Sequence, residues 1–177
     1  MPELKVTNLT GKHVLILDGE AVAGAKQNRV LNTTILIGAG TSLVIPVSCT
    51  EHGRWAYHTD RFEDSDVCMS PSLRSRKNLS VSMALKSSGQ HRADQGDVWE
   101  SIAELHHRHG TQSGTGAMKD AFEHKRQDID SYQKAFACQD GQCGMIVVIL
   151  NESHSFTDIE HRIRLTDSNY PALTTCE

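Results

Sequence analysis

The sequence predicts an α+β fold in which an antiparallel β-sandwich-like sheet is followed by two helices and a returning buried strand. Short apolar runs separated by glycine-rich turns fill residues 4–85, which is typical of a sandwich or small barrel. Apolar residues recur at helical spacing between residues 94 and 137. An uninterrupted apolar run at residues 145–150 then predicts a strand that is buried on both faces.

The predicted strands of the first half lie at residues 5–8, 13–17, 30–37 and 42–49. Asp18 and Gly19 end the second of these strands, because Asp-Gly is a strong turn signal. Pro46 places the strand at residues 42–49 at a sheet edge or a bulge, since proline lacks the N–H that an internal ladder needs.

The next segment divides into a loop and a strand. Clustered acidic and basic residues leave little to bury at residues 58–78, so a surface loop is expected there. Residues 78–85 alternate between polar and apolar with a period of two. This alternation predicts a strand with one solvent-facing side.

Two helices are expected after residue 90. Val98, Ile102 and Leu105 follow the i, i+4, i+7 pattern, with Asp94 or Asp97 as the N-cap and Gly110 after the last turn. Apolar positions that share one face extend the second helix over residues 117–137: Met118, Phe122, Ile129, Tyr132 and Phe136.

The C-terminal residues admit two interpretations. Thr157 and Glu160 fit a capping box, which favours a short helix through Leu165. The alternation over residues 161–165 fits a strand equally well.

Charge and cysteine content bound the class of protein. The 177 residues carry a net charge of −4, with +2 in residues 1–90 and −6 in residues 91–177, which makes extended nucleic acid an unlikely partner. The longest apolar run, residues 145–150, is far too short to span a bilayer, and the first residues do not resemble a secretory signal. Five cysteines without a Cys-x-x-Cys pair favour a reducing compartment, so a soluble, cytoplasmic protein is expected.

Lys26, Gln27, Asn28 and Arg29 form the first candidate ligand-binding segment. Their long or amide-bearing side chains could present donors to an anion or a nucleobase. The alternative interpretation is a solvated hairpin connection without a ligand.

A second candidate segment covers residues 48–55. Cys49 could be an activated nucleophile, with His52 or His91 as base and Glu51 or Asp94 as orienting acid. Cys49 and His52 could instead be half of a zinc site, or Cys49 could be a buried structural thiol. Arg54 and Trp55 offer a cation and an aromatic face for stacking, or form an ordinary surface pair.

The third segment is the entry to the first helix. His91, Arg92 and Gln95 lie where free amide groups and the helix dipole favour an anion. Asp94 could orient His91 as a base, or serve only as the N-cap.

A fourth cluster, His106, His107 and His109, allows a metal site. Adjacent helical residues point in different directions, however, and cations near a helix C-terminus are favoured by the dipole.

The segments at residues 24–33, 45–55 and 91–99, in this order, resemble the prokaryotic ARPP-1 domain, the ARG and rhodanese-phosphatase-superfamily-associated protein domain. The resemblance covers roughly residues 4–149. It implies a stand-alone α+β domain at residues 1–150, with a divergent tail at residues 151–177. It also implies genomic association with ADP-ribosylglycohydrolase and phosphatase-like proteins, and carries over no catalytic role. The matching positions are Lys26, Gln27, Asn28, Arg29, Cys49, Glu51, Arg54, Trp55, His91, Arg92, Asp94 and Gln95.

These patterns lead to one main hypothesis and two rivals. The first is a domain that binds or acts on a phosphate-bearing small molecule, a nucleotide or an ADP-ribosyl group, because cations from three segments could converge on an anion. The expected catalytic residues are Cys49, His91 and Asp94, the other matching positions are expected to bind ligand, and the cofactor stays unknown. The rivals are a non-enzymatic interaction module that uses a sheet edge and acidic helices, and a zinc-dependent hydrolase built on Cys49, His52, His58 or His91.

Overall fold

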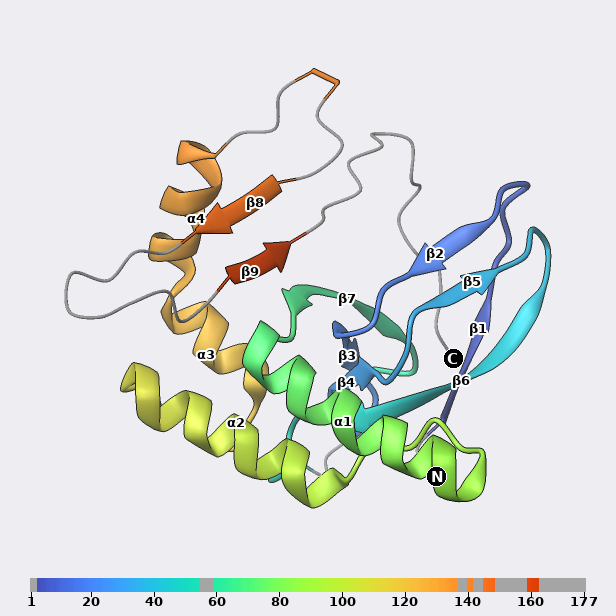
Figure 1. The fold of residues 1–177 in the computed structure, drawn as a ribbon, viewed down its shortest axis with the longest axis horizontal. Helices are drawn as coiled ribbons and strands as arrows, with labels where there is room; N and C mark the ends of the chain where they lie inside the picture. Colours follow the sequence, from blue (N-terminus) through green and yellow to red (C-terminus); the bar gives the residue numbers. More distant parts are fainter. Residues whose placement is uncertain (1–2, 55–58, 137–139, 142–144, 149–158, 163–177) are drawn as a thin grey trace. The chain divides into compact units, whose positions relative to one another are not determined.

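The computed structural model describes residues 3–54, 59–136, 140–141, 145–148 and 159–162 (Figure 1). The strands are β1 (Glu3–Thr7), β2 (Val14–Ile16), β3 (Glu20–Gly24), β4 (Arg29–Leu31), β5 (Ile35–Ile37), β6 (Ser42–Cys49), β7 (Phe62–Cys68), β8 (Met145–Val148) and β9 (Ile159–Arg162). The helices are α1 (Pro71–Ser88), α2 (Gln95–His109), α3 (Met118–His124) and α4 (Arg126–Ala135).

A curled, antiparallel, five-stranded sheet forms a half-barrel with the strand order β1-β6-β4-β3-β7. A smaller sheet pairs β2 with β5. The α+β class is therefore confirmed, with a half-barrel in place of the expected sandwich-like sheet.

The prediction that Pro46 places its strand at a sheet edge or bulge was wrong. The strand, β6, lies inside the five-stranded sheet, between β1 and β4. The carbonyl of Pro46 accepts a hydrogen bond from Asn32 N at 3.2 Å. Across the other side, Pro46 is opposite Glu3, the first residue of β1. The missing N–H therefore falls near the end of a short ladder, where the loss of one hydrogen bond disturbs the pairing least.

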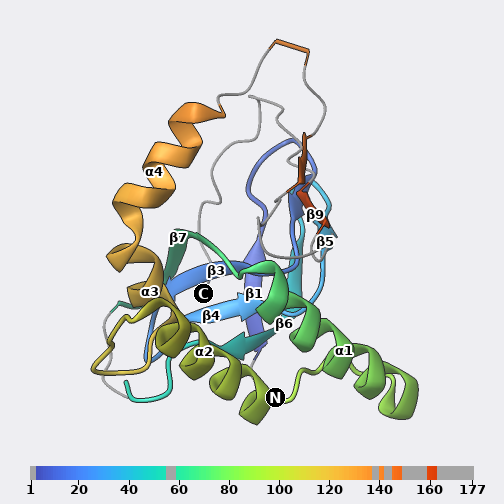
Figure 2. The ribbon, with the colours of Figure 1, turned by 60° about the vertical axis from the view of Figure 1, so that its left-hand side comes forward.

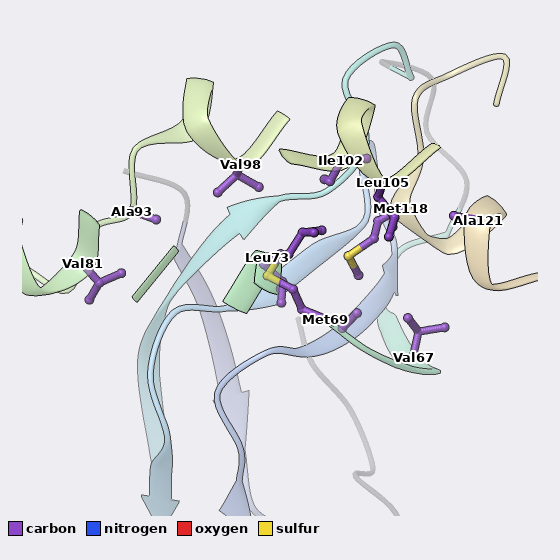
Figure 3. Packing of buried hydrophobic residues seen from close by; sticks show 12 residues of the cluster. Val67, Met69, Leu73, Val81, Ala93, Val98, Ile102, Leu105, Met118 and Ala121 are labelled. Atoms are coloured by element: carbon purple, nitrogen blue, oxygen red, sulfur yellow. The ribbon is translucent and has the colours of Figure 1, made fainter. Parts of the chain in front are cut away.

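The five-stranded sheet is covered on both faces (Figure 2). Ala21 and Val30 belong to a core that it shares with α1, α2 and α3. Their neighbours Val22 and Leu31 belong to a second core with β2 and β5. This alternation follows from the pleat, which turns successive side chains to opposite faces. Figure 3 shows the first core, with side chains of the strands and helices gathered below α2.

The single strand predicted at residues 30–37 is two strands, β4 and β5, in different sheets. Asn32, Thr33 and Thr34 carry the chain from the half-barrel to the small sheet. The turn expected at Asp18 and Gly19 is confirmed, and Gly19 adopts a positive φ of 86°.

The predictions for residues 58–85 were wrong in two respects. Within the expected surface loop, residues 62–68 form β7, which lies at one edge of the half-barrel. The expected strand at residues 78–85 belongs to α1, which begins with Pro71 and ends at the left-handed Gly89. Its buried residues Leu73, Lys77 and Val81 are spaced by four. A lysine in the middle of the buried stripe hides the helical period from a hydrophobicity pattern.

The first predicted helix is confirmed as α2, with Asp94 as its N-cap and Gly110 after its end. The second is divided into α3 and α4. Residues 1–126 and 127–171 belong to separate compact units. The strand predicted at residues 145–150 is β8, which pairs with β9 in a separate two-stranded sheet of the second unit. The prediction that this strand returns to the main sheet was therefore wrong for the described residues. Of the strand interpretation for residues 161–165, residues 161 and 162 belong to β9, and residues 163–165 lie outside the described residues.

Candidate functional site

A pocket of about 390 Å³ lies where the segment before α2 meets β4 and β6. Its volume is within the range of small-molecule sites, roughly 300–1,000 Å³. Six predicted site residues line it: Gln27, Arg29, Cys49, His91, Arg92 and Gln95. The remaining lining residues are Asn32, Pro46, Val47, Ser48, Ala93 and Trp99. Segments that are more than 60 positions apart in the sequence therefore contribute to one concave surface.

Strand register brings Arg29 and Cys49 together. The two residues are direct partners in the antiparallel pair of β4 and β6, so their side chains project from the same face. The Arg29 guanidinium donates to Cys49 Sγ, and its Nη1 also donates to Gln27 Oε1 at 3.3 Å. Burial lowers the pKa of Arg29 from its ordinary value, because the charged form loses hydration. None of the ion pairs found in the described part of the chain includes Arg29.

Gln95 holds the backbone of Cys49 in place. Its Oε1 accepts from Cys49 N at 2.8 Å, and its Nε2 donates to Cys49 O at 2.8 Å. The side-chain amide therefore binds β6 as a neighbouring strand would. This pair of bonds fixes the first turn of α2 against the end of β6, at the residue whose thiol Arg29 contacts.

Asn32 makes a second connection across the pocket. Its Nδ2 donates to His91 O at 3.1 Å, while its Oδ1 accepts from Ser48 Oγ at 2.7 Å. The backbone at His91 is thus fixed by the residue that follows β4, although the side chains of His91 and Arg92 are exposed. Both side chains can reach a ligand from the rim.

Asp94 is the N-cap of α2. Its Oδ1 accepts from Gly96 N at 2.9 Å and from Asp97 N at 3.2 Å. It does not line the pocket. Within the described residues, no hydrogen bond joins its carboxylate to His91.

Asn28, Glu51 and Arg54 form a neighbouring polar network. Glu51 is only 4% exposed and accepts from Arg54 Nε at 2.9 Å and from Thr115 Oγ1 at 2.8 Å. Arg54 also donates to Asn28 Oδ1 at 3.0 Å. These three predicted ligand-binding residues therefore bond to one another and to the protein, and none of them lines the pocket.

Of the three remaining predicted residues, the structure describes only Lys26. Lys26 is exposed on the connection between β3 and β4. Trp55 and His58 lie outside the residues that the structure describes.

No group of three or more metal-ligating side chains occurs within the described residues. His106, from the histidine cluster, instead connects two backbone segments. Its Nδ1 lies 2.8 Å from Thr111 Oγ1 and its Nε2 lies 3.0 Å from Ala117 O. Since a carbonyl can only accept, Nε2 carries the proton in this arrangement.

Trp99 and Asn32 are pocket residues that were absent from the predicted site. Trp99 follows Gln95 by four positions, so the helical period places both on one face of α2. That spacing was the available sequence signal. The ring of His52 packs edge-on against Trp99, with centroids 4.4 Å apart and an angle of 78°. Asn32 gave no comparable signal, because its role depends on where β4 ends.

The family model of the ARG and Rhodanese-Phosphatase-superfamily-associated Protein domain, ARPP-1, matches residues 1–176. This match includes residues 151–176, which lie beyond the range of the sequence resemblance. The comparisons with curated proteins and with solved structures gave no match. Among the described residues, no helix combines the length and apolar character required to cross a membrane.

Proposed function

The chain belongs to the ARPP-1 domain family, and we propose that its pocket binds a phosphate-bearing small molecule. The main support for this proposal is that the partly buried charge of Arg29 is not paired with a carboxylate among the described residues. Its guanidinium lines the pocket, has lost hydration and has no carboxylate partner within the described residues. A bound phosphate would supply the missing negative charge and accept from the guanidinium in a bidentate arrangement.

Two rim residues favour the same class of ligand. Arg92 is exposed at the pocket, and His91 beside it gains a positive charge when it is protonated. They stand just before the N-terminus of α2, whose first amide groups donate to the Asp94 carboxylate. The local charge of the pocket is therefore opposite in sign to the net charge of −4 for the whole chain.

The remaining walls favour a nucleotide or an ADP-ribosyl compound over inorganic phosphate. Trp99 presents an aromatic side chain, and Pro46, Val47 and Ala93 add apolar surface. Such surfaces contribute binding energy for a base or sugar that inorganic phosphate does not have.

Catalysis by Cys49, His91 and Asp94 stays a prediction. Cys49 and His91 line the pocket, whereas the Asp94 carboxylate is engaged by its own helix. The proposal of binding does not depend on a reaction at these residues.

Calorimetry with ADP-ribose tests the proposal. Arg29→Ala and Arg92→Ala are expected to abolish measurable binding, because each removes a charged hydrogen-bond donor worth about 1.5–3 kcal/mol. Arg61→Ala is the matched control, since Arg61 is exposed and lies outside the pocket lining. Binding that is unchanged in both pocket variants would contradict the proposal.

A further inference from the structure

We propose that Cys49 is a covalent modification site, at which its thiolate attacks low-molecular-weight disulfides that carry carboxylate groups. The product is a mixed disulfide inside the pocket. This inference rests on the arrangement around the thiol and does not require that the pocket also binds phosphate.

The contact between Arg29 and Cys49 is the first observation. The guanidinium donates directly to Sγ, and the two residues are cross-strand partners, so the sheet itself maintains the contact. A cation adjacent to a thiol stabilises its thiolate form, which is the nucleophile in disulfide exchange. Arg29 has also lost hydration, so a thiolate beside it offsets part of that cost.

Access is the second observation. Cys49 is a free cysteine of intermediate burial, and it lines a pocket large enough for a small molecule. Both backbone groups of Cys49 are bound by Gln95. The backbone is therefore held still while the thiol is open to a reagent from the pocket side.

The charge of the pocket selects the reagent. Arg29 offsets the charge of the Cys49 thiolate, Arg92 adds a further positive charge, and the lining residues that the structure describes include no acidic one. A disulfide that carries carboxylates is attracted to this surface, whereas one that carries ammonium groups is repelled. Oxidised glutathione is a suitable anionic probe, and cystamine is its cationic counterpart.

The reaction is balanced without any further reagent. The Cys49 thiolate attacks one sulfur of the disulfide, a new S–S bond forms, and the original S–S bond breaks. The departing thiolate takes up the proton that Cys49 had lost. Cys49 is oxidised to the level of a disulfide, and half of the reagent is reduced to a thiol.

Cys68 offers a comparison within the same chain. It is also of intermediate burial, and Arg74 Nη1 lies 3.9 Å from its Sγ, but it lies outside the pocket. Arg74→Gln is therefore a matched control for Arg29→Gln, because each removes a guanidinium beside a different cysteine.

The test measures the rate of modification at each cysteine of the full, reduced chain by peptide mapping with mass spectrometry. The reagents are oxidised glutathione, the neutral 2-hydroxyethyl disulfide and cystamine. We expect Cys49 to react with oxidised glutathione about tenfold faster than the synthetic peptide 46–52 does. The expected order of rates at Cys49 is anionic, then neutral, then cationic.

Arg29→Gln should lower the rate of modification at Cys49 by about tenfold, and Arg74→Gln should leave this rate unchanged. Arg92→Gln should reduce the preference for the anionic reagent and keep the rate with the neutral one. Circular dichroism confirms that each variant is folded. If Arg29→Gln does not fold, the proposal is tested by the wild-type rates with the three reagents and by the change in reagent preference in Arg92→Gln. A Cys49 rate no higher than that of the peptide, or a rate at Cys49 independent of reagent charge, would overturn the proposal.

Discussion

Lys77 is a charged side chain that is almost completely buried, at 1% exposure. Its ammonium group contacts the Asp18 carboxylate and donates to Leu31 O and Asn32 O, both at 3.1 Å. One side chain of α1 thus binds the turn after β2 and the end of β4. Since Asn32 lines the pocket, Lys77 also holds the backbone of a pocket residue.

Replacing Lys77 by alanine should lower the free energy of unfolding by about 3 kcal/mol, because it leaves Asp18 and two carbonyls without this donor. Urea denaturation measures the change. Lys86→Ala, on the exposed last turn of the same helix, is the control and should change stability by less than about 0.5 kcal/mol. Equal effects of the two substitutions would show that Lys77 has no special role.

The pH dependence of stability provides an independent test of Lys77. Burial lowers the pKa of Lys77 below its ordinary value of 10.5, so the folded protein releases this proton at a lower pH than the unfolded chain does. Between these two pKa values the unfolded chain binds more protons, and the free energy of unfolding therefore rises with pH. The difference in stability between wild type and Lys77→Met should increase as the pH rises towards the ordinary lysine pKa of 10.5. A difference that stays constant or falls would contradict this assignment.

Among the helices and strands, the sequence predicted best those that begin or end with a recognisable cap or turn residue. The Asp94 cap and the Gly110 end of α2 are both present, and the Asp-Gly turn after β2 is as expected. The strand predicted at residues 78–85 failed because α1 buries only Leu73, Lys77 and Val81 and exposes Leu79 and Met83. Lys77 is buried because it bonds to Asp18 and to the carbonyls of Leu31 and Asn32. The spacing of apolar residues along the helix gives no information about these distant partners.

The N-terminus of α2 provides a prediction that separates the two roles considered for Asp94. Asp94→Ala removes the acceptor for Gly96 N and Asp97 N, and should cost about 1 kcal/mol of stability in urea denaturation. Asp94→Asn keeps a good cap without the charge, and should stay near wild type in both stability and ADP-ribose binding. Loss of binding in a stable Asp94→Asn protein would show that the carboxylate acts on the ligand or on His91 instead.

For the whole molecule, both hydrophobic cores lie within the first compact unit. Their buried residues extend from Leu4 in β1 to Ala121 in α3. The half-barrel, the small sheet and the first three helices therefore make up a unit that contains both cores.

A fragment of residues 1–126 should consequently fold and unfold in a single cooperative urea transition, because both cores are retained. Circular dichroism and near-ultraviolet spectra against denaturant provide the measurement. A fragment without a cooperative transition would show that the second unit is required for folding.

The site could be predicted only in part. Local sequence indicated that Arg29, Cys49, His91 and Arg92 belong to polar segments, and the fold places all four on one pocket. The same reasoning included Glu51 and Arg54, whose charges are paired with each other. Which cations are paired within the protein depends on strand register and on the loop that carries Thr115, and both are tertiary features.

A crystal structure of the protein grown with saturating ADP-ribose would show whether Arg29 and Arg92 bind phosphate in the pocket. We expect phosphate oxygens about 2.7–2.9 Å from the guanidinium nitrogens of Arg29 and Arg92. We also expect the ligand to contact Trp99 or the apolar wall formed by Pro46 and Val47. An empty pocket, or a ligand bound elsewhere on the molecule, would show that the pocket is not a phosphate site.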